Sequence, residues 1–189
     1  MKRLNRLVVA DPKRCVGCRI CELACATVHE KGSKPLTSGN LNHPLSPRLH
    51  LIRAAEMTAP VQCRHCEDAP CARACPSHAI HRTDKGVLVD ESECTGCKSC
   101  VLACPFGAID IGPFYKEGRS VLSTDGSPRV TALKCDLCTT WGEPACVASC
   151  PHDALCFVDP DALRQKRSLE AALSLRVVGS ARSGGCDER

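Results

Sequence analysis

Sixteen of the 18 cysteines of the chain fall into four groups of four, which we call quartets one to four. In chain order they are Cys15, Cys18, Cys21 and Cys25; Cys63, Cys66, Cys71 and Cys75; Cys94, Cys97, Cys100 and Cys104; and Cys135, Cys138, Cys146 and Cys150. Thiols at this density can form disulfides, bind zinc or bind iron–sulfur clusters. The spacing within each quartet is the first feature that separates these three possibilities.

Quartet three, in the stretch CTGCKSCVLACP, spaces its cysteines two, two and three residues apart and ends in proline. Bacterial ferredoxins use this spacing to give three ligands to one cluster and the fourth to a neighbouring cluster. Structural zinc sites more often use two well-separated C-x-x-C pairs, and they give no reason for the prolines at 76, 105 and 151. Iron–sulfur clusters are therefore favoured, with a zinc-stabilised binding module as the remote alternative and disulfides less favoured still.

The quartets also form an internal repeat of two alternating types. VVADPKRCVGCRICELAC and VLVDESECTGCKSCVLAC each place an apolar strand and an Asp before the cysteines, and Gly17 and Gly96 let the backbone approach the cluster sulfides. CRHCEDAPCARACP and CDLCTTWGEPACVASCP form the second type, with a longer gap after the second cysteine. This pattern predicts an α+β fold of duplicated bacterial-ferredoxin-like, two-cluster units with short strands and short helices, the fourth cysteine of each quartet starting a helical turn.

Composition restricts both the interior and the partners of the chain. Aromatic residues make up only 3% of 189 residues, so a bound group is expected to supply part of the core. The formal charge of +4 becomes about −4 if four oxidised clusters each add roughly −2. Basic residues are scattered, which argues against nucleic-acid binding. No segment approaches the roughly 18 apolar residues of a membrane span, so direct membrane insertion is not expected.

Compartment and reaction class follow from what the chain lacks. The N-terminal apolar run is four residues long, too short for a signal-peptide core, so the sequence predicts a cytoplasmic protein whose thiols stay reduced. We find no nucleophile elbow, phosphate-binding glycine loop or dinucleotide fingerprint. The chain is therefore predicted to be an electron carrier or electron-transfer subunit and not an enzyme.

From about Leu7 to Val158 the sequence resembles the four-cluster, ferredoxin-type iron–sulfur subunits of the molybdopterin oxidoreductase family. The motifs that carry the resemblance are CRHCEDAPC and the run KCDLC…PAC…CP between Lys134 and Pro151. It implies four [4Fe–4S] clusters and a role in anaerobic metabolism. It also implies electron transfer between a molybdenum or tungsten oxidoreductase, with formate dehydrogenase favoured, and a hydrogenase or other redox protein. The alternative is a subunit of another molybdopterin oxidoreductase.

The same resemblance implies that the quartets pair in a nested order, two with three and one with four. The four ligand sets are then Cys63, Cys66, Cys71 and Cys104; Cys94, Cys97, Cys100 and Cys75; Cys15, Cys18, Cys21 and Cys150; and Cys135, Cys138, Cys146 and Cys25. Residues 1–60 and 113–160 would form an outer ferredoxin-like unit, residues 61–112 an inner unit, and residues 161–189 a C-terminal helix and disordered tail.

The remaining candidates lie beside or beyond the quartets. His65 and His78 neighbour ligands and either donate hydrogen bonds to cluster sulfurs or are exposed loop residues. Cys156 is predicted to be a buried small apolar residue, and Cys186 an exposed bystander. The segment DPDALRQKRSLEAALSLRVVG has an Asp cap, an early Pro and a closing Gly, so it predicts a helix. Its expected packing residues are Leu163, Leu169 and Leu173.

Overall fold

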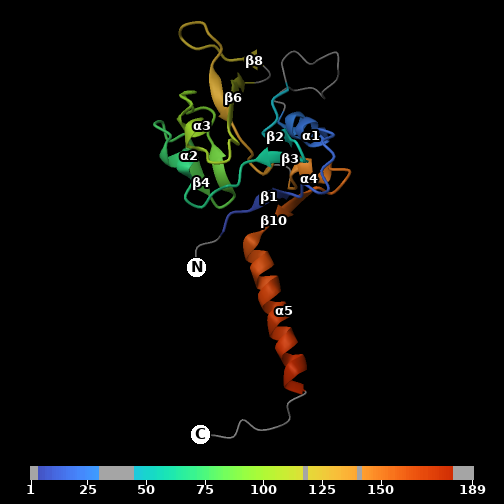
Figure 1. Cartoon of the computed structure of the whole chain (residues 1–189). Coiled ribbons are helices and arrows are strands. Elements are labelled where there is room, and N and C mark those ends of the chain that lie inside the picture. The colour runs from blue at the N-terminus through green and yellow to red at the C-terminus, as the bar shows by residue number, and fades with distance from the viewer. Residues whose placement is uncertain (1–3, 30–44, 117–118, 140–141, 181–189) are drawn as a thin grey trace.

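The structure is a computed structural model that describes residues 4–29, 45–116, 119–139 and 142–180 (Figure 1). Its helices are α1 (Ile20–Val28), α2 (Pro70–Arg73), α3 (Ser99–Ala103), α4 (Ala145–Ala148) and α5 (Pro160–Ser180). Its strands are β1 (Leu7–Ala10), β2 (Leu49–Ala54), β3 (Met57–Gln62), β4 (Ile80–Thr83), β5 (Gly86–Val89), β6 (Asp110–Pro113), β7 (Tyr115–Lys116), β8 (Arg119–Ser120), β9 (Val130–Leu133) and β10 (Leu155–Val158). The predicted combination of small helices and short strands is confirmed.

The elements before α5 form two lobes that lie side by side in Figure 1. In one, which we call the α1–α4 lobe, α1 packs on α4, β1 pairs with β10, and β2 pairs with β3. In the other, the α2–α3 lobe, α2 packs on α3, β4 pairs with β5, and β6 pairs with β9. All of these strand pairs are antiparallel. Elements from the two ends of the chain thus meet in one lobe.

Each lobe has its own small buried core, and cysteines make up much of both. The core of the α2–α3 lobe includes Cys71, Cys75, Cys94 and Cys100, packed with aliphatic side chains such as Ile80 and Ile109. The core of the α1–α4 lobe includes Cys21, Cys25 and Cys146, packed with Val8, Leu49, Leu137 and Leu155. The expectation of a thin polypeptide core agrees with this arrangement, since no aromatic side chain is among these buried residues.

The backbone repeats at the same place in every quartet. The second residue after the first cysteine has a positive φ in all four cases: Gly17 at 76°, His65 at 48°, Gly96 at 69° and Leu137 at 61°. Glycine adopts this conformation without steric cost, whereas residues with a Cβ do not. The repeat seen in the sequence is therefore also a repeat of loop geometry. At two of its four positions, His65 and Leu137, the residue has a Cβ and its backbone is strained.

The position of the helical turns differs from the prediction. The third cysteine of each quartet, not the fourth, lies near the start of a short helix: Cys21, Cys71, Cys100 and Cys146 are each its second residue. In quartets two to four the fourth cysteine follows the helix, whereas Cys25 lies within α1, which continues to Val28.

The boundary proposed between the ferredoxin-like units crosses one strand pair. β9 belongs to residues 113–160, which the sequence grouped with the outer unit, yet it pairs with β6 in the α2–α3 lobe. Ala132 of β9 packs in the core of that lobe. The chain therefore returns to the α1–α4 lobe only after β9, at Lys134 and quartet four.

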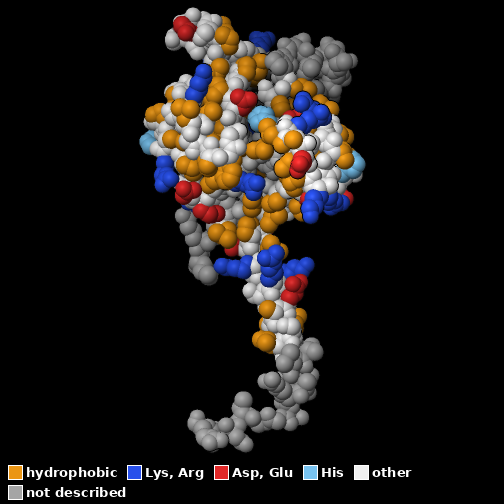
Figure 2. All heavy atoms as spheres, in the orientation of Figure 1, with side chains coloured by type: hydrophobic (Ala, Val, Ile, Leu, Met, Phe, Trp, Pro, Cys, Tyr) orange, Lys and Arg blue, Asp and Glu red, His pale blue; other side chains and the backbone are white. Residues whose placement is uncertain are grey.

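Helix α5 extends away from both lobes (Figure 1). Asp159 and Pro160 begin it as predicted, but it continues past Gly179 to Ser180. The predicted packing is wrong: Leu163, Leu169 and Leu173 are 40%, 61% and 48% exposed. Figure 2 shows charged and apolar side chains together along this helix. Within the described residues, no helix combines the length and apolar character that crossing a membrane requires.

The two cysteines outside the quartets have different outcomes. Cys156 lies on β10 and is exposed, so the prediction of a buried residue is wrong. The alternation of β10 explains this, because Leu155 faces the core and its neighbour therefore faces outward. Cys186 lies outside the described residues, as do the other residues of the predicted disordered tail, SARSGGCDER, apart from Ser180, which ends α5.

Candidate iron–sulfur sites

A hollow in the α1–α4 lobe brings three cysteines of quartet one to the last cysteine of quartet four. Its lining includes Cys15, Cys18, Cys21 and Cys150, together with the backbone of Gly17. Cys150 is far from the other three in sequence and reaches them because β10, which follows it, pairs with β1, which precedes quartet one. These four thiols are one of the sets expected from the resemblance.

A second hollow, in the α2–α3 lobe, has the same composition. Its lining includes Cys94, Cys97 and Cys100 of quartet three and Cys75 of quartet two, with Gly96 at its wall. Here the packing of α2 on α3 brings the fourth cysteine of one quartet to the first three of another. Both hollows thus join three cysteines of one loop with one from elsewhere, as two-cluster ferredoxins do.

Some thiols of the other two expected sets also affect one another electrostatically. Burial raises the pKa of Cys66, and the neighbouring Cys63 and Cys104 thiols raise it further. Burial also raises the pKa of Cys146 to about 12, with contributions from Cys25 and Cys138. Each fourth cysteine again acts on thiols of a different quartet.

Closely packed buried thiols cannot all ionise without a compensating cation. The pKa of Cys100 is raised to about 11 by burial and by its neighbours Cys94, Cys71 and Cys75. Iron and zinc bind the thiolate form, so a metal is what would hold four deprotonated sulfurs together. Every described cysteine is a free thiol, available for such binding.

Backbone N–H groups point at the sulfur atoms as they would at thiolates. The amide of His65 donates to Cys63 Sγ at 3.4 Å, and the amide of Leu137 donates to Cys135 Sγ at 3.4 Å. The amides of Ala108 and Ala154 donate to Cys104 and Cys150 at 3.4 and 3.3 Å. Hydrogen bonds of this kind stabilise negative sulfur and help to set the potential of a cluster.

The glycines of the first repeat type are restricted by protein neighbours. A Cβ on Gly96 would lie 2.5 Å from Val130 Cγ2, and one on Gly17 would lie 3.1 Å from Thr58 Cγ2. Both positions also have positive φ. Thus the two glycines fit the loops closely against β9 and β3, in addition to the close approach to sulfide predicted for them.

Lys134 and His65 are the two largest side chains that are almost wholly buried among the described residues. Lys134 is 2% exposed, and its ammonium donates to the carbonyls of Val87 and Cys135. No described carboxylate forms an ion pair with it. A buried cation needs a nearby anion, and thiolate-bound clusters would supply one. The donor set therefore fits an anionic metal group better than an empty core.

His65 carries one of the three buried side-chain polar atoms, with Gln62 Oε1 and Thr131 Oγ1, that lack a hydrogen-bond partner in the described part of the chain. It is 1% exposed, its Nδ1 accepts the Val87 N–H at 3.1 Å, and its Nε2 is buried without a partner. Burial, together with the Lys134 charge, lowers the pKa of His65 to about 3, so the ring is neutral at pH 7. Because Nδ1 is an acceptor, Nε2 bears the proton. It is a donor that lacks an acceptor.

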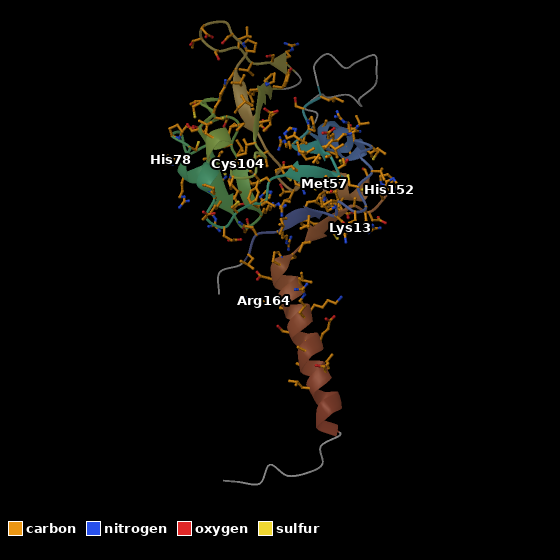
Figure 3. The ribbon with its side chains drawn as sticks, viewed as in Figure 1. Lys13, Met57, His78, Cys104, His152 and Arg164 are labelled. Carbon is orange, nitrogen blue, oxygen red and sulfur yellow. The ribbon has the colours of Figure 1, made fainter. Side chains whose placement is uncertain are left out.

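His78, the other histidine considered from the sequence, is exposed at the surface of the α2–α3 lobe (Figure 3). Its φ is 54°, and it occupies the third position after Cys75, as Asp153 does after Cys150. His78 thus has a role in the turn after the proline, where the repeat tolerates different side chains.

An ion-pair network that the sequence did not reveal joins the lobes. Arg48 donates to Asp136 Oδ2 at 2.8 Å and to Glu91 Oε1 at 2.9 Å, and its backbone N–H donates to Cys25 Sγ at 3.3 Å. Asp136 also pairs with His29 Nε2 at 3.0 Å. Burial lowers the pKa of His29, but hydrogen bonds with Asp136 and Cys25 outweigh it and raise the pKa to about 9.

These residues left different signals in the sequence. Lys134 is part of the KCDLC motif, and His65 separates two ligands, so both could be marked as candidates from their position. Arg48 follows a Pro-rich segment and lies 88 residues from Asp136, so nothing in the sequence pairs them. Only the folded chain brings those charges together.

The known proteins to which the chain is similar include a 4Fe-4S domain family and named iron–sulfur and electron-transport proteins. A family described as a 4Fe-4S dicluster domain matches residues 55–160. The electron transport protein HydN of Escherichia coli (strain K12) is 40% identical over 166 residues, which cover 86% of this chain and 93% of HydN. An iron-sulfur protein of Rhodospirillum rubrum is 40% identical over 182 residues, covering 91% of this chain and 94% of that protein.

A third similar protein is much longer. The chain is 42% identical over 163 residues to the putative oxidoreductase AegA of Escherichia coli (strain K12), and it spans only 23% of AegA. The chain belongs to the 4Fe-4S dicluster domain family. The class predicted from the sequence, an iron–sulfur electron-transfer protein, is confirmed by this membership.

Proposed function

We propose that the chain transfers electrons through four [4Fe–4S] clusters and has no substrate chemistry of its own. The observation that carries this proposal is the convergence of three cysteines from one quartet with one from another, seen directly at two hollows. When bound, each cluster takes up or releases one electron. The chain supplies thiolates that would bind the clusters and backbone amides that donate to sulfur.

The ligand sets we propose are the nested ones. They are Cys15, Cys18, Cys21 and Cys150; Cys135, Cys138, Cys146 and Cys25; Cys63, Cys66, Cys71 and Cys104; and Cys94, Cys97, Cys100 and Cys75. The packing of α1 on α4 and of α2 on α3 supports this order. The corresponding division is residues 1–60 and 113–160 against residues 61–112 as two ferredoxin-like units, with β9 pairing across the boundary.

The partners we propose are a molybdenum or tungsten oxidoreductase, with formate dehydrogenase favoured, and a hydrogenase or other redox protein. Hydrogenase-4 component A of Escherichia coli (strain K12), 38% identical over 187 residues, supports the hydrogenase side by its name. The sequence resemblance supports the formate dehydrogenase side. We place the protein in the cytoplasm, because a reducing compartment keeps thiols available for cluster assembly.

Metal content and spectrum test the cluster proposal against zinc. Protein purified anaerobically should contain about sixteen iron and sixteen sulfide per chain and show broad visible absorption that dithionite bleaches. A colourless, zinc-loaded protein, or iron far below this value after reconstitution, would contradict it. Partner identity is tested separately: formate with formate dehydrogenase should bleach the loaded protein, and hydrogenase should then reoxidise it.

The exchange of ligands between quartets predicts an unusual effect of Cys75→Ala. Cys75 lies in quartet two, but the variant should lose the cluster of Cys94, Cys97 and Cys100, because Cys75 lines that hollow. EPR of the reduced protein should show three clusters. Cys156→Ala is the matched control, since Cys156 is exposed and outside every quartet, and it should retain four. Selective loss of the quartet-two cluster would refute the nested sets.

A further inference from the structure

Two equivalent junctions lie between quartets two and four, each built around a buried valine. In the first, which we call the Val87 junction, Val87 accepts a hydrogen bond from Lys134 and donates one to His65 Nδ1. In the second, the Val8 junction, the Val8 carbonyl accepts a hydrogen bond from Gln62 Nε2 at 2.9 Å. Val8 and Val87 are 0% and 1% exposed.

The two junctions are related by the internal repeat. Val8 and Val87 each stand seven residues before the first cysteine of a quartet of the first type. Gln62 and Lys134 each stand directly before the first cysteine of a quartet of the second type. Both reach from there to the carbonyl of a valine on another strand. The same architecture is thus built twice.

The ligand loops complete the correspondence. His65 is the second residue after Cys63, and Leu137 is the second residue after Cys135. Both have positive φ, the position that glycine occupies in quartets one and three. Leu137 packs in the same buried cluster as Val8, as His65 packs against Val87. The Val8 junction therefore pairs an amide with an aliphatic side chain.

The Val87 junction has polar chemistry at both corresponding positions. It holds a cation, Lys134, with no described carboxylate partner, and a neutral imidazole whose Nε2–H has no acceptor. Without a nearby anion or acceptor, burial of the Lys134 ammonium and of the His65 Nε2–H would each cost desolvation free energy. His65 also stores backbone strain that a glycine would avoid. Both features indicate a group that positive charge and N–H donors would attract, which is an anion.

Lys134 acts on ligands of two different sets. Its ammonium donates to the carbonyl of Cys135, a member of one set. It also donates to the carbonyl of Val87, which packs in one buried cluster with Cys71, a member of another set. The Lys134 ammonium therefore favours negative charge on both sides of the junction. Because the group is buried, salt and water screen this effect far less than they would at the surface.

We propose that Lys134, with His65 as its hydrogen-bonding companion, selectively raises the reduction potential of the clusters bound by the sets that contain Cys71 and Cys135. This inference rests on the proposed function, since it concerns loaded clusters. Reduction adds one negative charge to a cluster, and a fixed cation stabilises that state more than the oxidised one. The two junction clusters then hold electrons in preference to the other two. Lys134 acts on these clusters through its charge and does not ligate iron.

The repeat itself supplies the test variants. Lys134→Gln replaces the lysine by the residue of the Val8 junction and removes the charge. In a potentiometric titration followed by EPR, two of the four clusters should shift to lower potential, with the equilibrium constant for reduction falling at least tenfold. For a one-electron couple this is 59 mV. The other two clusters should keep their potentials.

Restoring the charge at the equivalent position separates electrostatics from packing. In Lys134→Gln combined with Gln62→Lys, the ammonium moves to the Val8 junction, so at least half of the lost potential should return. His65→Leu, the other repeat residue, should lower the same two potentials by removing the Nε2–H donor. Lys85→Gln is the control: it removes a charge from an exposed turn and should shift no cluster.

Iron content keeps the two proposals distinguishable. If the unaltered protein lacks about sixteen iron atoms per chain, the proposed function fails first. If the unaltered protein is fully loaded and the clusters of Lys134→Gln have the same reduction potentials as its clusters, only the role of Lys134 is overturned. Loss of all four clusters from both Lys134→Gln and the double variant would also overturn it, because Lys134 would then support the fold as a whole.

Discussion

Gly86 is the residue on which the position of His65 depends. A Cβ at Gly86 would lie 2.6 Å from His65 Nδ1, and the Gly86 φ of 121° is one that other residues rarely adopt. Gly86→Ala should therefore displace the imidazole from the Val87 N–H and destabilise the loaded protein by about 3 kcal/mol. The measurement is the guanidinium concentration at which the visible absorption is lost.

Gly126→Ala is the control that distinguishes the steric clash with His65 from the strain of a positive φ. Gly126 has a φ of 79°, but a Cβ there would meet nothing within 4 Å. The control should cost about 1 kcal/mol, the strain of the left-handed conformation alone. Equal effects of the two substitutions would show that the contact with His65 contributes nothing.

Single residues could be proposed as ligands from the sequence where spacing alone defined their chemistry. The sixteen cysteines are of this kind, because the distance between ligands along a loop is set by the geometry of the cluster. Lys134 and His65 are not, since their importance comes from burial and from the shared contact with Val87. Burial depends on which strands pair, and a short motif does not contain that information.

Helix α5 shows the same division at the level of an element. Asp159 Oδ1 accepts the N–H groups of Asp161 and Ala162, both at 3.1 Å, and so caps the helix as its sequence predicts. The backbone signals of a helix are local and could be read directly. What the leucines contact is not local, and in the described structure they face solvent.

Asp159→Ala should therefore loosen α5 without affecting the clusters. Loss of the cap costs about 1 kcal/mol, so amide exchange at Asp161 and Ala162 should accelerate roughly fivefold, while iron content stays the same. Glu170→Ala is a suitable control, because its pair with Lys166 is exposed and 4.0 Å long. A fall in iron content in Asp159→Ala would instead connect α5 with the cluster-binding lobes.

At the scale of the whole molecule, ion pairs between side chains of opposite charge connect the two lobes. Arg48 connects Asp136, in quartet four, with Glu91, which precedes quartet three. The exposed fractions of Arg48, Asp136 and Glu91 side chains are 12%, 27% and 16%, so the network is partly shielded from water. The repeat predicted two related units, but their relative placement depends on such contacts between distant segments.

Arg48→Met should weaken the attachment of one lobe to the other. It removes the guanidinium from two partly buried carboxylates, a change that costs about 3 kcal/mol. If separation of the lobes exposes the clusters, a chelator should bleach the variant on the order of a hundredfold faster, since each 1.4 kcal/mol is about tenfold. Arg73→Met, which breaks an exposed pair with Asp68, should change the rate less than about fivefold. Equal rates for the two variants would mean that the lobes are held by their cores and bound clusters, and that the Arg48 network only orients Cys25 and Asp136.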